Sequence, residues 1–90
     1  MSGPDAWDEL RRRCVEVHVD EQLFRDKPLV VAQMFFVAWP IRADFDYSAQ
    51  AFVYWLVSPT FPERPMRAEP PPRWRAVFTG ERFVGFEPGL

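Results

Sequence analysis

An almost unbroken apolar run, LVVAQMFFVAWPI at residues 29–41, constrains the fold of this 90-residue chain more than any other feature. Valine, phenylalanine and tryptophan dominate the run, and these side chains favour extended structure, so we predict a strand over residues 29–39. Successive side chains of a strand point to opposite sides of its sheet. Both sides of this strand are apolar, with Gln33 as the only polar group. Such strands lie at the centre of a sheet that is covered on both faces.

A second segment, AQAFVYWLV at residues 49–57, repeats the two-sided apolar pattern. In a strand, Tyr54 would lie on one side of the sheet and Trp55 on the other. The polar sequence between the two segments, IRADFDYS at residues 41–48, is typical of a loop. The sequence therefore predicts two central strands within residues 28–58.

Residues 1–25 are predicted to be mainly helical. Trp7, Leu10 and Cys14 recur at three- and four-residue spacing, which places them along one side of a helix. A rival pattern overlaps the end of this helix, because valines alternate with polar residues over positions 14–20, as they do in a strand. The sequence leaves both interpretations open, a helix that reaches the low twenties or a fifth strand over residues 14–20.

The rest of the chain divides into a connection and a hairpin. Residues 59–72 are so rich in proline that neither a helix nor a central strand can form there, and we predict an extended connection. Residues 73–88 form two short alternating segments around Gly80, which predicts a C-terminal hairpin. The length suits a single domain over residues 1–90.

The predicted element order is one helix followed by a four-stranded antiparallel sheet, which is an α+β fold. This order resembles that of the cystatin-like class, in which a curved sheet wraps a long helix. The resemblance implies that the helix covers one face of the sheet.

Composition limits the classes of partner. Hydrophobic residues make up 48% of the chain and aromatic residues 17%, so the chain has enough apolar surface to fold into a core. The net charge is −2 with acids and bases interspersed, which argues against a nucleic-acid partner. Cys14 is the only cysteine, so an intrachain disulfide is excluded. Residues 29–41 are shorter than the ~20 apolar residues that a membrane-spanning helix needs, and we expect a soluble cytoplasmic protein.

One helix covers only one face of the predicted sheet, so the second apolar face needs another cover. There are three candidates for that cover: a strongly curled sheet whose two ends close over the face, the connection 59–72, and a second protein chain. We favour the second chain and predict a non-catalytic protein-interaction module that acts through its apolar sheet face as a homodimer or as a subunit of a larger complex. The expected contact surface consists of large aromatic side chains. They are Phe36, Trp39, Phe52, Tyr54 and Trp55.

The single histidine, His18, is the first residue to consider for chemistry. If residues 14–20 form a strand, Glu16, His18 and Asp20 project from the same side and offer three metal ligands. Metal ligands normally converge from more than one element, so we expect a solvated polar surface with no metal, no cofactor and no catalytic residue.

An alternative function is a small-molecule binding domain or enzyme with its pocket between the helix and the concave sheet. The residues expected to line that pocket are Trp7, His18, Phe36 and Tyr54.

Overall fold

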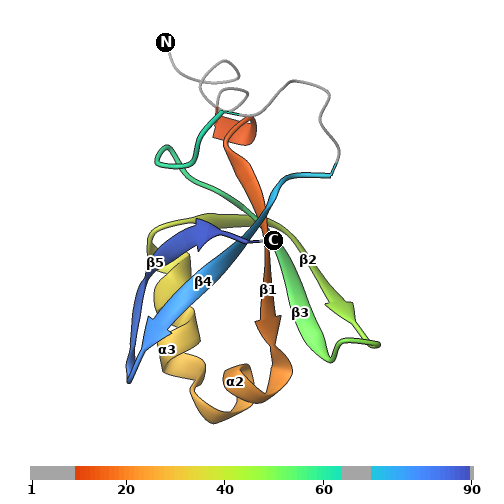
Figure 1. Cartoon of the computed structure of the whole chain (residues 1–90), viewed down its shortest axis with the longest axis vertical. Coiled ribbons are helices and arrows are strands. Elements are labelled where there is room, and N and C mark those ends of the chain that lie inside the picture. The colour runs from red at the N-terminus through yellow and green to blue at the C-terminus, as the bar shows by residue number, and fades with distance from the viewer. Residues whose placement is uncertain (1–9, 64–69, 90) are drawn as a thin grey trace.

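The computed structural model describes residues 10–63 and 70–89, so Trp7 lies outside the described residues. Its centre is a five-stranded mixed sheet with the strand order β2-β3-β1-β4-β5 (Figure 1). The α+β class predicted from the sequence is confirmed. The strands are β1 (Cys14–Asp20), β2 (Trp39–Asp46), β3 (Ala51–Val57), β4 (Arg73–Thr79) and β5 (Arg82–Pro88), and the helical elements are α2 (Glu21–Asp26), α3 (Pro28–Ala32) and the 3₁₀ helix η1 (Gln33–Phe36).

Strand β1 occupies residues that we predicted to belong to a helix, and it is the fifth strand that the rival pattern indicated. It pairs antiparallel with β3 along its whole length and parallel with β4. Val15, Val17 and Val19 point to one side and are buried there. Pairing on both edges and burial of these β-branched side chains outweigh the helical spacing that the prediction used.

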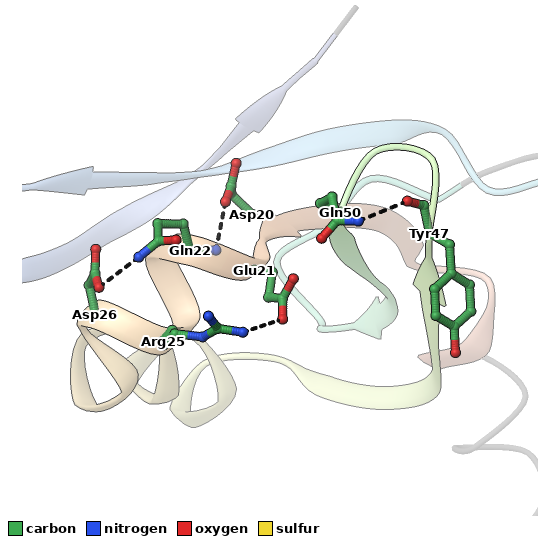
Figure 2. A network of polar contacts seen from close by, with 7 residues as sticks. All are labelled: Asp20, Glu21, Gln22, Arg25, Asp26, Tyr47 and Gln50. Carbon is green, nitrogen blue, oxygen red and sulfur yellow. Dashed lines mark hydrogen bonds and ion pairs between the residues drawn. The ribbon is translucent and has the colours of Figure 1, made fainter.

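Helix α2 follows β1 without a connecting turn because Asp20 caps it. The Asp20 carboxylate accepts a hydrogen bond from the backbone N–H of Gln22 at 2.7 Å, and Arg25 pairs with Glu21 at 2.7 Å along the helix (Figure 2). The N–H of Glu21 donates to the carbonyl of Gln50 at 3.0 Å. The start of α2 is thereby fixed to the turn between β2 and β3.

The prediction of a strand over residues 29–39 is wrong, because most of this run is helical. Pro28 is the first residue of α3, where proline fits well since its missing N–H has no partner in the first helical turn. The chain continues through η1, so Val31 and Met34 come to the same side and are buried against the sheet. The run covers one face of the sheet instead of forming its centre (Figure 1).

Gln33, the polar residue within this run, has a structural role. Its side-chain oxygen accepts a hydrogen bond from the backbone N–H of Phe83 at 2.8 Å. Phe83 belongs to β5, so this bond fastens η1 to the outermost strand on that side of the sheet.

The loop predicted over residues 41–48 is largely strand β2, which forms the other edge of the sheet. Polar and apolar residues alternate there, as in an edge strand with one side towards solvent. The turn that follows is closed by Asp46, whose carboxylate accepts hydrogen bonds from the N–H groups of Ser48 and Ala49 at 3.0 and 3.2 Å. Gln50 completes it with a positive φ of 56°. The strand predicted over residues 49–57 is confirmed as β3.

The C-terminal hairpin is confirmed as β4 and β5, joined at Gly80 with a φ of 61°. Its position in the sheet differs from the prediction. Strand β4 lies beside β1 and runs parallel to it, so the sheet has five strands of mixed direction instead of four antiparallel ones. The cystatin-like order is also not reproduced, because β1 precedes α2 and α3, and these helices contain only six and five residues.

The core lies between the helices and one face of the sheet, which we call the helix-covered face. Phe61, from the predicted connection 59–72, also belongs to this core, where its ring centroid lies 5.6 Å from that of Trp74 and 5.2 Å from that of Phe86. Residues 58–63 and 70–72 contain no helix or strand, and the residues between them are not described. Within the two described ranges, none of the helices has the length and apolarity needed to cross a membrane.

Candidate functional site

The side of the sheet opposite the helices, which we call the open face, carries a group of polar side chains. Strand pairing brings them together from three strands, since Glu16 of β1 lies opposite Trp55 of β3, and Trp55 lies opposite Arg42 of β2. His18 and Asp44 project from the same face, two residues along their strands. We call these five residues the polar cluster: Glu16, His18, Arg42, Asp44 and Trp55.

Glu16 is the centre of the polar cluster. One of its carboxylate oxygens lies 2.8 Å from Nε2 of His18, and the other accepts a hydrogen bond from the indole N–H of Trp55 at 3.1 Å. An ionised carboxylate can only accept hydrogen bonds, so the His18 Nε2 carries the proton in this pair. Both oxygens of Glu16 are therefore occupied by donors from the chain itself.

The environment of Glu16 favours its ionised form. Partial burial raises the pKa of this carboxyl, but the hydrogen bonds from His18 and Trp55 and the charges of His18 and Arg73 lower it by more. The net result is a pKa below the ordinary value of 4.5.

Arg42 covers the exposed side of the cluster. Its guanidinium carbon lies 4.9 Å from the centre of the Trp55 ring, and its Nη2 lies 3.5 Å from a carboxylate oxygen of Asp44. A shallow hollow of about 290 Å³ opens beside these residues and is also lined by Phe45. Of the charged residues that line the hollow, Arg42 and Asp44 pair with each other, and Asp46 accepts backbone N–H groups of the β2–β3 turn.

The structure separates the three residues considered as metal ligands. Glu16 and His18 contact each other, but the Asp20 carboxylate caps α2 instead. In the part of the chain that the structure describes, no three or more His, Cys, Asp and Glu side chains come together in a way that could hold a metal ion.

A second hollow of the open face, about 240 Å³, is lined by His18, Arg73 and Arg75. Two of these three side chains have acidic partners. Arg75 pairs with Glu87 across the β4–β5 hairpin, and His18 pairs with Glu16. These pairs reduce the attraction of the hollow for an anion.

The other distinctive surface is apolar and comes from the helical run. Leu29, Phe36, Val37 and Trp39 are 81%, 86%, 53% and 56% exposed, although Val31 and Met34 beside them are buried. Leu29 of α3 and Phe36 of η1 both face solvent on the outside of this helical run. We call these four exposed residues the apolar strip.

The apolar strip continues into a groove beside strand β5. Val37 lines this groove, of about 350 Å³, together with Val84 and the ring of Phe83. Val84 is itself more than half exposed. The apolar surface therefore extends from η1 onto the outermost strand of the sheet.

The five residues predicted to form one contact surface lie on three different surfaces. Phe36 and Trp39 belong to the apolar strip. Phe52 and Tyr54 face the helices, where their ring centroids lie 6.3 Å apart and Tyr54 is almost fully buried. Trp55 belongs to the polar cluster on the open face.

The described residues of the alternative pocket do not converge either. His18 is on the open face, Tyr54 on the helix-covered face, and Phe36 points into solvent. The sequence pattern placed Glu16 and His18 on one side of a possible strand, but it did not place Arg42 or Asp44 beside them, because these two residues join the cluster through β2, which we predicted as a loop.

Comparisons with known proteins identify no relative: no family model, no curated protein and no solved structure matches the chain.

Proposed function

We propose that this protein is a small, non-catalytic interaction module that binds another protein through the apolar strip. The observation that carries this proposal is the exposure of four large hydrophobic side chains from a single segment of eleven residues, 29–39. Burying each of them in a complex would contribute about 1.5–3 kcal/mol. Contiguous apolar surface of this kind on a small protein is typical of a site where another protein binds.

The exposure of Phe36 has no explanation in the fold of the chain itself. A Phe side chain at the end of η1 gains nothing from packing when it is 86% exposed. Large aromatic side chains contribute most of the binding energy at protein interfaces. Phe36 is therefore the expected anchor of the contact, with Leu29 beside it.

The other two surfaces support the proposal less well. The helix-covered face is filled by its own core, in which Val15 and Leu56 are completely buried. On the open face, Glu16 has both of its carboxylate oxygens hydrogen-bonded within the chain. Neither surface offers another protein a set of exposed apolar side chains, as the apolar strip does.

Photo-crosslinking tests the proposal. A photoreactive phenylalanine analogue at position 36, introduced in cells that natively produce the protein, should form a covalent adduct with one defined protein upon irradiation. The matched control places the same analogue at Arg75, which is exposed on the open face, on the other side of the sheet from the helical run. Adduct formation at position 36 alone supports the proposal, and equal labelling at both positions or none at either contradicts it.

A second variant separates binding from folding. Phe36→Ser should change the free energy of unfolding by less than about 0.5 kcal/mol, because the side chain is exposed. With a photoreactive group at position 29, the same substitution should weaken adduct formation strongly. A variant that unfolds, or that crosslinks as well as the parent, would argue that Phe36 has a structural role.

A further inference from the structure

Strand β2 forms one edge of the sheet and pairs only with β3 among the described strands. Alternate backbone N–H and C=O groups of an edge strand point outward and are available to another strand. We propose that a second copy of this chain pairs here, with β2 antiparallel to β2 about a two-fold axis, so that the two sheets become continuous. This inference goes beyond the proposed function, because it uses the backbone and the charges of β2 and shares only Trp39 with the apolar strip.

Charge complementarity selects the register. When two copies of a strand pair about a two-fold axis perpendicular to the sheet, residues that face each other across the strands have side chains on the same side of the sheet. The axis must therefore pass between two copies of the same residue. With the axis at Ala43, Arg42 lies opposite Asp44 of the second copy, and Asp44 lies opposite Arg42 of the second copy. Oppositely charged pairs across two strands are favourable, and like charges in that position are unfavourable.

Neighbouring registers are excluded by the same charges. An axis at Arg42 places two arginines opposite each other, and an axis at Asp44 does the same with two aspartates. Both groups are largely exposed and already lie in one row on the open face, paired at 3.5 Å within the chain. Each would exchange this partner for the equivalent group of the other copy without leaving its side of the sheet.

On the other side of β2, Phe45 is half-buried in the single chain. Ile41 is the extra residue of the bulge and lines a hollow with Arg42 and Trp55, so it lies outside the regular pairing. Phe45 is already held in position by two rings, with centroids 5.0 Å from that of Phe52 and 4.9 Å from that of Tyr47. Ala43 is exposed and small, so it allows the two strands to approach at the axis.

The two ends of the strand carry exposed aromatic residues. Trp39 is the first residue of β2 and is 56% exposed. Tyr47 directly follows the last residue of β2 and is 80% exposed. Figure 2 shows the Tyr47 ring pointing away from the polar network, although its carbonyl is bonded to Gln50. Antiparallel pairing brings the beginning of one strand to the end of the other, so each Trp39 comes near Tyr47 of the second copy.

Two features that commonly protect edge strands, a proline and a bulge, lie at the beginning of β2, at Pro40 and between Pro40 and Arg42. A third feature, charged side chains, lies in the rest of the strand, where the proposed register pairs Arg42 with Asp44 of the second copy. From Arg42 to Asp46 the register with β3 is unbroken. The two pairs formed by Arg42 and Asp44, and the Ala43 pair between them, lie within this regular part.

The opposite edge, β5, has no equivalent register. The register of β5 with β4 is broken between Phe83 and Gly85, so no regular stretch of β5 contains both Arg82 and Glu87. Glu87 is also engaged with Arg75. The charge pattern therefore favours β2 over β5 as the pairing edge.

Sedimentation equilibrium of the full chain, from about 1 µM to 500 µM, tests the proposal. The unchanged protein should show a monomer–dimer equilibrium. Arg42→Asp and Asp44→Arg, each alone, place like charges opposite each other and should raise the dissociation constant by about tenfold or more. The double variant Arg42→Asp/Asp44→Arg restores opposite charges and should return to within about threefold of the unchanged protein.

Two controls make the outcomes distinct. Arg82→Asp changes an exposed charge on the other edge strand and should leave the dimer unchanged. Phe36→Ser removes the anchor of the apolar strip and should also leave it unchanged, so failure of the proposed function does not affect this result. A monomer at every concentration, a double variant no better than the single ones, or a dimer lost with Phe36→Ser but not with Arg42→Asp overturns the proposal.

Discussion

At the scale of single residues, Glu16 shows how a strand position acquires a defined charge. Its carboxylate lies in the middle of β1 with 21% of the side chain exposed, close enough to the surface to remain ionised and close enough to His18 and Trp55 to be held by both. A carboxylate with such donors is more stable in the folded chain than in the unfolded one.

Glu16 therefore makes stability depend on pH. Because its pKa is lower in the folded protein than the ordinary value of 4.5, its contribution is fully present above pH 4.5 and is lost as the pH falls through the folded pKa. We predict that Glu16→Gln lowers the free energy of unfolding by about 1 kcal/mol at pH 7. The difference from the unchanged protein should shrink as the pH falls from 5 to 3, measured by urea unfolding at each pH.

The matched control for this prediction is Glu81→Gln, since that side chain is 82% exposed and pairs only with Lys27 among the described residues. Its effect should be small at every pH. If Glu16→Gln reduces stability equally at pH 7 and pH 3, the effect comes from packing and not from the charge of Glu16.

At the scale of elements, the segment 29–39 can be tested by two neighbouring substitutions. In a strand, Met34 and Phe36 would point to the same side and respond alike. In the helical segment Met34 is fully buried and Phe36 is exposed. We predict that Met34→Ala lowers the free energy of unfolding by about 2–4 kcal/mol and that Phe36→Ala changes it by less than about 0.5 kcal/mol, measured by urea unfolding. Equal losses for the two variants would indicate a strand.

Elements whose signals are local were predictable from the sequence. The hairpin β4–β5 has alternating apolar residues around a glycine turn, and the strand β3 is a short run of β-branched and aromatic residues that follows a polar segment. Both are confirmed. The run 29–41 was not predictable in this way, because a continuous apolar segment has no period that distinguishes a strand from a buried helix. The useful signal was Pro28, which we interpreted as the end of a helix although it also suits the first residue of one.

The candidate site was less accessible to sequence reasoning than the fold. Strand alternation over 14–20 placed Glu16 and His18 on one side, and the structure brings them together. Trp55 joins them because β3 pairs with β1 in a particular register, and Arg42 joins through the next strand. Such registers connect residues far apart in the chain, so a local pattern contains no information about them.

At the scale of the whole molecule, the core depends on both ends of the described chain. Strand β1 lies between β3 and β4, and the rings of the β4–β5 hairpin pack against the valines of β1. We predict that deletion of residues 73–90 abolishes cooperative thermal unfolding and the near-ultraviolet circular dichroism of the core, because it removes one neighbour of β1 and exposes Phe61. A synthetic peptide of residues 70–90 added in trans is the control and should restore both signals.

Cooperative unfolding of the shortened chain alone would show that the remaining strands and helices form an independent unit. That result would also contradict the prediction of a single domain over residues 1–90. Restoration by the peptide would instead show that the loss comes from missing packing and not from damage to the rest of the chain.

The parallel contact of β1 with β4 also has a consequence for biosynthesis. Ribosomes release a chain from its N-terminal end, so β1 leaves the exit tunnel long before its neighbour β4 has been translated. Until then, one edge of β1 is unpaired in the nascent polypeptide, and the valines that the hairpin later covers are exposed. The sheet can be completed only after β4 and β5 have also left the tunnel, and during that interval the nascent chain exposes the kind of apolar surface and strand edge that chaperones protect from aggregation.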